Sequence, residues 1–315
     1  MLKFIKNWTL PLAMLVGALG YLVLSRLSFV APFKPIVNEG IAWFTPFLIF
    51  AQLLLTFCKV EPKELLPKAW HWWLLSFQTV SCGVLAWVLL VCPMSEAYRS
   101  VVAGAMVCLI CPTATAAAVI TGKLGGSAST LTTYTLLSNL LAAVAVPLVF
   151  PLVEPHEGLG FVAAFFKILG KVFPLLLSPF FVALLLRYVF PKIHRALLTY
   201  HGVAFYLWAI ALAIVTGQTV RSLVNSTADV SVEVMVAMAG LAACAVQFFL
   251  GKNIGGMYAD RISAGQALGQ KNTVLAIWMA FTYLNPLSSV APGSYVIWQN
   301  LFNSWQLWKR RKKQG

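Results

Sequence analysis

Charged residues are scarce in this sequence of 315 residues, and acidic ones are the scarcest. Only 10% of the residues are charged, against roughly 25% in soluble proteins, and 60% are hydrophobic. The nine acidic residues all lie outside the centres of the apolar stretches. This composition excludes an ordinary soluble domain and indicates a protein that crosses a membrane many times.

The sequence also lacks the residue patterns of metal sites and hydrolytic enzymes. Its six cysteines include no CxxC pair, and the apolar blocks contain no HExxH, no paired aspartates and no Ser/His arrangement. The glycines of "GKLGGSAS" (122–129) do not have the spacing of a phosphate-binding loop. We therefore expect no enzyme activity, no metal and no cofactor.

Ten apolar blocks recur along the chain, each close to the roughly 20 residues that a membrane-spanning helix needs. They predict spans at 8–27, 41–57, 70–91, 101–122, 127–152, 172–190, 202–220, 232–250, 262–284 and 290–308. Between the fifth and sixth, "FVAAFFKILGKVF" (161–173) is either an amphipathic surface helix or the start of a long tilted span.

The net charge of +14 follows the positive-inside rule. If both termini are cytoplasmic, 16 of the 23 basic residues lie in inside segments, including "KRRKK" at 309–313, and six lie outside. This asymmetry explains the charge without nucleic acid as a partner. The remaining basic residue is Lys271, inside a span.

Aromatic residues suggest two further environments. His71, among three tryptophans, fits an interfacial aromatic belt better than a ligand site. Trp278, Tyr283, Tyr295 and Trp298 either line a cavity or, as a slightly stronger reading, face lipid.

Similar polar interruptions in the two halves indicate an internal duplication. "CPTATAA" (111–117) interrupts the fourth span and "GQKNT" (269–273) the ninth. Pro112 and Gly269 are the predicted helix breaks, because proline removes an amide donor and glycine loosens a helix. Threonine hydroxyls near Pro112 can satisfy freed backbone groups. Two facing breaks would form a polar substrate site near the bilayer midplane.

Two segments resemble a known family. "CPTATAAAVITGKLGGSASTLTTYTLLSNLLA" resembles the fourth-to-fifth helix region of the bile acid:sodium symporter family, with its pattern C-P-G-G-T-A-S-N. "GQKNTVLAIWMAFTYLNPLSSVAPGSYVIWQNLFNS" resembles the ninth-to-tenth region, with E-x-G-x-Q-N-S-G-L-A followed by V-P-G-x-x-x-S-V-W-H-N. With ten predicted spans, the likeness covers nearly the whole chain, and bacterial homologues are the nearest kind.

The resemblance implies an all-α polytopic membrane protein. Its ten transmembrane helices would form two inverted five-helix repeats, with discontinuous helices four and nine crossing in a core domain beside a panel domain. We take 1–315 as one transporter domain, with repeats over 1–153 and 161–308 and a basic cytoplasmic tail over 309–315.

Transport of organic anions, usually with two sodium ions, is the implied function. The expected substrate-binding residues are Thr113, Thr115, Asn139, Lys271, Asn272, Thr273 and Asn300. The expected residues of a degenerate coupling-ion site are Gln78, Thr135, Gln266 and Gln270.

Most of the family's sodium ligands are replaced here, although sodium needs several oxygen ligands. The family's Ser-Asn pair in helix four falls on Ala117 and Ala118, and its serine in helix five on Leu131. Its Glu in helix nine falls on Ala267 and its Gln on Lys271. A shift of one residue would bring Gln266 opposite the Glu, but a neutral amide supplies no charge.

Lys271 is the most unusual residue, since a lysine at the bilayer centre costs about 2.5 to 3.5 kcal/mol on insertion scales. We hypothesise that its ammonium stands where the family binds sodium. A permanently charged Lys271 predicts a sodium-independent uniporter or exchanger, and one that releases its proton predicts proton coupling. In the alternative, Lys271 snorkels to an interface or plugs an inactive site.

The sequence thus predicts a secondary transporter of organic anions, bile acid-like or small carboxylates, that works by alternating access in a bacterial inner membrane. Its partners would be the anion, the lipid bilayer and sodium or a proton as coupling ion. The alternative is an ion exchanger like the sodium/proton antiporters that share crossed helices, although the aspartates they use are missing.

Overall fold

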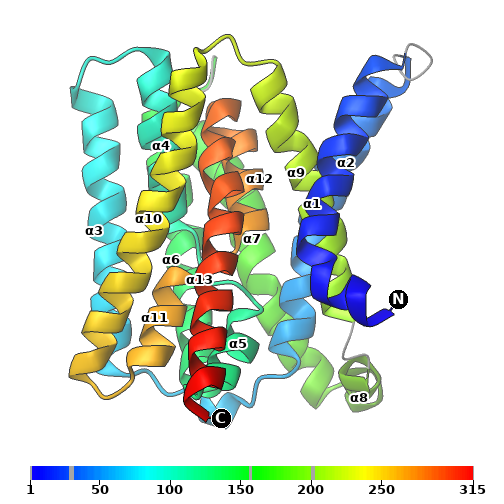
Figure 1. Ribbon diagram of the computed structural model, residues 1–315, viewed down its shortest axis with the longest axis vertical. Coiled ribbons are helices and arrows are strands. Elements are labelled where there is room, and N and C mark those ends of the chain that lie inside the picture. The colour runs from blue at the N-terminus through cyan, green and yellow to red at the C-terminus, as the bar shows by residue number, and fades with distance from the viewer. Residues whose placement is uncertain (1, 28–31, 156–157, 200–202, 315) are drawn as a thin grey trace. The chain divides into compact units, whose positions relative to one another are not determined.

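The computed structural model describes residues 2–27, 32–155, 158–199 and 203–314, and this part of the chain is all-helical (Figure 1). The predicted all-α class is therefore confirmed. The only strand-like feature in these ranges is one isolated β-bridge. In chain order the α-helices are α1 (Leu2–Arg26), α2 (Lys34–Phe57), α3 (Ala69–Val91), α4 (Glu96–Ile110), α5 (Ala117–Leu124), α6 (Ala128–Val153), α7 (Phe161–Tyr188), α8 (Pro191–Thr199), α9 (Val203–Val224), α10 (Val230–Met257), α11 (Arg261–Gly269), α12 (Thr273–Tyr283) and α13 (Val290–Gln314).

Helices cover all ten apolar blocks of the sequence. In the described part of the chain, six helices are long and apolar enough to cross a membrane: α2, α3, α6, α7, α9 and α10. Shorter apolar helices lie at Pro11–Arg26 and Thr273–Tyr283. The chain is therefore a multi-pass integral membrane protein.

Two of the blocks are divided rather than continuous. α4 ends at Ile110 and α5 begins at Ala117, so Pro112 lies in the interruption. α11 ends at Gly269 and α12 begins at Thr273. Proline has no amide hydrogen to continue a helical ladder, which accounts for the position of the first interruption.

The segment 161–173 is the first part of α7, a helix of 28 residues. Of the two readings of this segment, the long span is correct, and a separate surface helix is wrong. The apolar sequence simply continues past Lys171, so nothing ends the helix there.

Helices α1, α2 and α9, together with residues from Ser178 to the end of α7, belong to one compact unit, formed by residues 1–59 and 178–227. α1 and α9 approach closely at Gly17, where an added Cβ would lie 2.0 Å from the Ala213 carbonyl oxygen. At the end of this pair, Asn225 Nδ2 donates a hydrogen bond to the Tyr21 hydroxyl at 3.1 Å.

The second compact unit consists of residues 60–177 and 228–315. In it α10 packs against α4, α11 and α13, while α3 packs against α4 and α6. Small residues allow these approaches: a Cβ on Gly240 would lie 2.3 Å from the Ala291 carbonyl oxygen, and one on Gly251 would lie 2.6 Å from that of Ala264. Such close backbone contacts are typical of packing between membrane helices. Both helix interruptions lie in this unit.

Candidate functional site

The two interruptions pair with each other as a short antiparallel ladder. Thr113 and Lys271 form the isolated β-bridge. On either side, the Asn272 amide donates to the Pro112 carbonyl at 2.9 Å, and the Ala114 amide donates to the Gln270 carbonyl at 2.8 Å. Backbone groups freed from the helices are thereby satisfied inside the protein, which membrane burial requires.

The side chains of the bridged residues reach across in opposite directions. Thr113 Oγ1 donates to the Ala267 carbonyl at 2.6 Å, and Lys271 Nζ donates to the Leu109 carbonyl at 3.3 Å. Both acceptors lie in the last turn of a helix, α11 and α4 respectively. Carbonyls in a last turn lack intrahelical partners and form the negative end of the helix dipole. The ammonium of Lys271 is therefore held by the C-terminal end of α4.

Two neighbouring helices brace the bridge. Ser138 Oγ on α6 accepts from the Thr113 amide at 3.2 Å. Gln299 Oε1 on α13 accepts from the Lys271 amide at 2.9 Å. Each strand of the bridge is thus fixed by one polar side chain from the helix that follows it.

A tyrosine and a glutamine support the end of each interrupted helix. Tyr134 donates to Gln78 Oε1, and Gln78 Nε2 donates to the carbonyls of Leu109 at 3.0 Å and Cys111 at 3.2 Å. In the other half, Tyr295 donates to the Gly269 carbonyl at 2.8 Å and accepts from Gln247 Nε2 at 3.1 Å. These buried groups rigidify the interruptions.

Corresponding contacts recur at fixed sequence offsets. Residues of the two interruptions correspond at 158 positions, so Thr113 matches Lys271 and Leu109 matches Ala267. Residues of α6 and α13 correspond at 161 positions, which pairs Tyr134 with Tyr295 and Ser138 with Gln299. Every backbone and side-chain bond across the bridge therefore has a counterpart in the other half.

Lys271 is only 1% exposed, so its ammonium does not snorkel to an interface. No Asp or Glu is buried among the residues the structure describes. The alternative of an interfacial lysine is wrong, and Lys271 has no acidic partner there. Its described side-chain partner is a carbonyl, which accepts one of three ammonium donors.

The other predicted substrate residues have diverse surroundings. Asn272 caps α12, with Oδ1 accepting from the Leu275 amide at 3.2 Å, and Thr273 is the buried first residue of that helix. Thr115 lies half-buried in the turn that precedes α5. Asn139 and Asn300 both turn their amide groups to their own helices, donating to Thr135 O at 2.8 Å and Val296 O at 2.7 Å.

The predicted coupling-ion residues divide into two groups. The Gln78 side chain is fully engaged, and Thr135 Oγ1 donates to the Leu131 carbonyl at 3.0 Å. By contrast, Gln266 is fully buried with neither polar side-chain atom bonded within the described residues. The oxygens Gln270 Oε1 and Asn139 Oδ1 are also buried without a described partner. Buried polar atoms of this kind need a ligand or water.

Several residues of the site were missed from the sequence. Ser138 and Gln299, not their neighbours Asn139 and Asn300, bond the bridge. One position turns a side chain by about 100° around a helix, and polar pairs in the sequence do not reveal which member faces inward. The shared offset of the tyrosines and of the Ser-Asn and Gln-Asn pairs was the available signal.

The aromatic predictions need correction. His71 is fully buried against Trp70 and Tyr134, and its Nδ1 accepts from the Lys68 amide at 3.1 Å, so it does not belong to an exposed belt. Trp278, Tyr283 and Tyr295 are buried rather than lipid-facing, and Trp298 is half-buried. Packing of α3 and α12 within the unit turned these rings inward.

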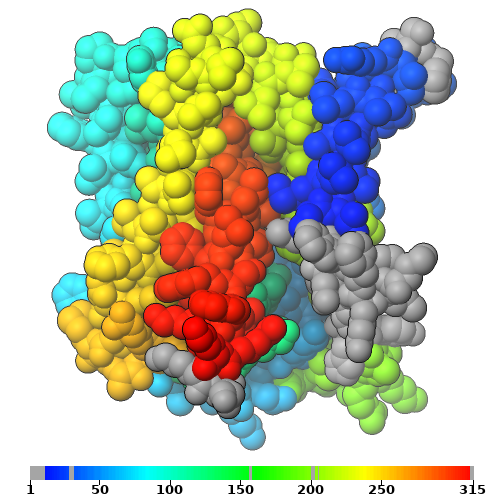
Figure 2. Space-filling view, viewed as in Figure 1, coloured from blue at the N-terminus to red at the C-terminus, as the bar shows by residue number. Residues whose placement is uncertain are grey.

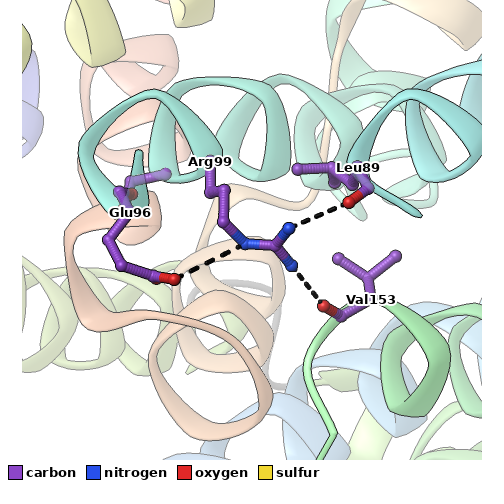
Figure 3. Close-up of polar contacts among 5 residues, drawn as sticks. Leu89, Glu96, Arg99 and Val153 are labelled. Atoms are coloured by element: carbon purple, nitrogen blue, oxygen red, sulfur yellow. Dashed lines mark hydrogen bonds and ion pairs between the residues drawn. The ribbon is translucent and has the colours of Figure 1, made fainter. Parts of the chain in front are cut away.

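A second polar feature lies where α3 and α6 end and α4 begins (Figure 3). Arg99 donates to the Leu89 carbonyl at 2.9 Å and the Val153 carbonyl at 2.8 Å, and its Nε lies 3.8 Å from Glu96. It borders a depression of about 510 Å³. Because the guanidinium caps two helix ends and pairs with Glu96, we assign it a structural role.

These features define a class: a helical membrane protein whose buried polar residues surround two paired helix interruptions. The sequence profile described as Sodium Bile acid symporter family matches residues 45–226, more than half of the chain. The chain therefore belongs to the sodium bile acid symporter family, as its motifs indicated. It is a membrane transporter of the bile acid symporter kind, and the family consists of transporters, not enzymes.

No curated protein matches the chain. The matched range includes Gln78, Pro112 and Thr113 but ends before α10. Lys271 thus lies outside the part of the chain that carries the family match.

Proposed function

We propose that this protein carries organic anions across the membrane by alternating access without requiring sodium. The observation that carries the proposal is the ammonium of Lys271, buried at the bridge 3.3 Å from the Leu109 carbonyl. A tethered cation supplies the positive charge that a bound sodium ion supplies in most of the family.

The surroundings of the expected sodium ligands support this proposal. The resemblance assigns ligands to the positions of Ala117, Leu131 and Ala267, and all three belong to one apolar cluster that also contains Trp70 and Leu74. Sodium in such a cluster would lack the oxygen ligands that replace its hydration shell. A packed apolar cluster therefore stands in place of one ion site.

The second expected ion position supports it as well. Gln78 and Lys271 donate to the same carbonyl, that of Leu109. Gln78 Oε1, the oxygen that could face a cation, accepts from Tyr134. A metal ion at this position would meet an ammonium and lose the glutamine oxygen, so repulsion opposes its binding.

An anion fits the remaining groups. Lys271 has ammonium donors beyond the one that Leu109 accepts, and Gln266 has an unbonded buried amide. The interruptions also direct the N-terminal ends of α5 and α12 away from the helix ends that hold the cation, and such ends favour negative charge. Carboxylates or sulfates of amphipathic guests are the substrate class with this chemistry.

The two inverted repeats are part of the same proposal. The paired bonds at constant offsets support them, and the compact units support a panel and a core. The first unit holds the first two helices of each predicted half, with α7 contributing in part, and the second unit holds the last three of each. Alternating access would then be a movement of panel against core, with both termini cytoplasmic in a bacterial inner membrane.

Uptake into proteoliposomes tests the proposal. Labelled taurocholate and a small carboxylate such as pantothenate serve as probes, with equal sodium or potassium outside. We expect the same uptake in both salts, and at least a 10-fold loss in Lys271→Ala. Lys167→Ala, which removes an exposed lysine of α7, is the control and should transport normally.

Strict dependence on a sodium gradient would overturn the proposal. A vesicle-enclosed pH dye separates the two remaining mechanisms. Proton movement that accompanies anion uptake would assign proton coupling to Lys271, whereas sodium-driven proton movement without an anion would favour the antiporter alternative.

A further inference from the structure

Three basic side chains converge at one end of the second unit. Lys252 comes from the last turns of α10, Arg261 begins α11, and Lys309 lies near the end of α13. Lys252 is close enough to both Arg261 and Lys309 for their charges to repel. We call these three residues the basic triad.

An indole lies between two members of the triad. Lys309 Nζ is 5.2 Å and Lys252 Nζ is 6.0 Å from the centroid of the Trp305 ring. Both ammonium groups therefore lie at the cation–π distance from one aromatic ring. This shared ring holds two like charges near each other.

No acidic side chain neutralises the triad. None of its members forms an ion pair within the residues that the structure describes. The neighbouring Asp260 carboxylate instead accepts from Trp70 Nε1 at 3.2 Å and Thr130 Oγ1 at 3.4 Å. Three uncompensated cations repel one another unless an anion joins them.

The surface beside the triad is apolar and aromatic. Trp305 is 50% exposed and Phe249, three residues before Lys252 on α10, is 69% exposed. Leu301, one turn before Trp305 on α13, is 56% exposed. Figure 2 shows this end of α13 lying beside α10 and α11 on one face of the unit. Cations at the end of an exposed apolar surface match a lipid with an anionic headgroup and acyl chains.

Neighbouring basic residues make the direction of the site specific. Arg310 points away from the triad, since its guanidinium lies against Gly125, the C-cap of α5 with φ +81°. Lys312 lies 5.6 Å from the Trp308 ring centroid. The basic end of α13 thus has one face that packs on α5 and another that faces outward.

We propose that the basic triad and Trp305 form a binding site for the phosphate headgroup of an anionic phospholipid, with the acyl chains along Phe249 and Leu301. A free inorganic anion would contact the cations but gain nothing from the exposed apolar surface. Anionic lipids are attracted to basic clusters at the inner surface, which is where the positive-inside rule puts this end.

Native mass spectrometry of the full-length protein in detergent tests the site. Phosphatidylglycerol, cardiolipin and phosphatidylcholine are titrated separately. We expect the two anionic lipids to bind at least 10-fold more tightly than phosphatidylcholine. The double variant Lys252→Gln/Lys309→Gln should lose about 10- to 30-fold in affinity for them. Lys167→Gln/Lys171→Gln removes the same charge from exposed positions on α7 and should bind as the wild type does.

Two further arms keep the result interpretable. An excess of inorganic phosphate should not displace phosphatidylglycerol, and displacement would identify a soluble-anion site instead. Phosphatidylglycerol should raise the melting temperature of the wild type but not of the Lys252/Lys309 variant, whose lipid-free melting temperature should be unchanged. Equal affinity for all three lipids, or no loss in the variant, would overturn the proposal. Neither readout involves transport, so sodium-dependent uptake would leave this result standing.

Discussion

Lys271 and Thr113 do the same structural work in the two halves of the bridge. Each is opposite the other, and each donates from its side chain to a carbonyl in the last turn of the opposing helix. A hydroxyl is enough for this bond, as Thr113 demonstrates. The positive charge of Lys271 is therefore an addition that the bridge itself does not need, which favours a role for it in function.

Replacing Lys271 with threonine separates the two roles. By the correspondence with Thr113, Lys271→Thr should keep a donor within reach of Leu109 O and a melting temperature within a few degrees of the wild type. It should nevertheless lose anion uptake, because the charge is gone. Melting in detergent and uptake by proteoliposomes provide the measurements.

Thr113→Val is the matched variant at the other position. It leaves the buried Ala267 carbonyl without its hydroxyl donor, which should lower the free energy of unfolding by about 1 kcal/mol. Uptake by Lys271→Thr at the wild-type rate would contradict a functional role of the charge.

At the scale of elements, proline alone does not explain where helices end. Pro46 lies inside α2, and Pro147 and Pro151 lie inside α6, yet both helices continue. Pro112 differs because its interruption has a partner: α11 also stops at the same level, and the two loops exchange backbone hydrogen bonds. The second interruption contains no proline and depends on Gly269, whose carbonyl accepts from Tyr295 and which faces the ring of Phe248.

The contact at Gly269 predicts a sensitive substitution. A Cβ there would lie 2.4 Å from the Phe248 ring, which also stacks on Phe302, so Gly269→Ala must displace packed groups. We expect it to cost about 1 to 3 kcal/mol of stability. Gly83→Ala, at a helix position with open space, is the control and should be neutral or stabilising.

A double-mutant cycle attributes the cost to this contact. Gly269→Ala should cost less in a Phe248→Leu background, measured by thermal unfolding in detergent. Equal costs in both backgrounds would show that another contact, or the backbone itself, is responsible.

At the scale of the whole molecule, the helices are grouped by their order within each half rather than by position along the chain. The first unit joins residues 1–59 to 178–227, and the second joins 60–177 to 228–315. A duplicated chain whose halves interlock gives this grouping, whereas two consecutive domains would not. Transport by such a protein requires an odd number of predicted spans between residue 92 and either inside terminus.

Cys92 provides a direct test of that topology. It is the exposed cysteine among the six, and it follows α3, which should end outside if the N-terminus is cytoplasmic. A membrane-impermeant maleimide should therefore label intact cells at Cys92, and Cys92→Ser should abolish labelling. The buried Cys58 should stay unlabelled near neutral pH, because burial raises the pKa of its thiol despite the opposing charge of Arg187 and so disfavours the reactive thiolate.

A second cysteine position completes the test. Lys63→Cys in the Cys92→Ser background should react only after the membrane is permeabilised, since this exposed residue belongs to an inside loop. Labelling of that variant in intact cells would contradict cytoplasmic termini.

The sequence by itself determined the helical class, the ten apolar blocks, the family and the unusual position of Lys271. These depend on composition and local order, because a span is defined by the apolar residues within it. The tertiary structure decided which polar residues meet. Ser138 and Gln299 face the bridge and Asn139 and Asn300 do not, His71 is buried, and Ala117, Leu131 and Ala267 close an apolar cluster. The rotation of a helix about its axis is set by contacts with helices distant in the chain, and no local pattern in a nearly uniform apolar segment specifies it.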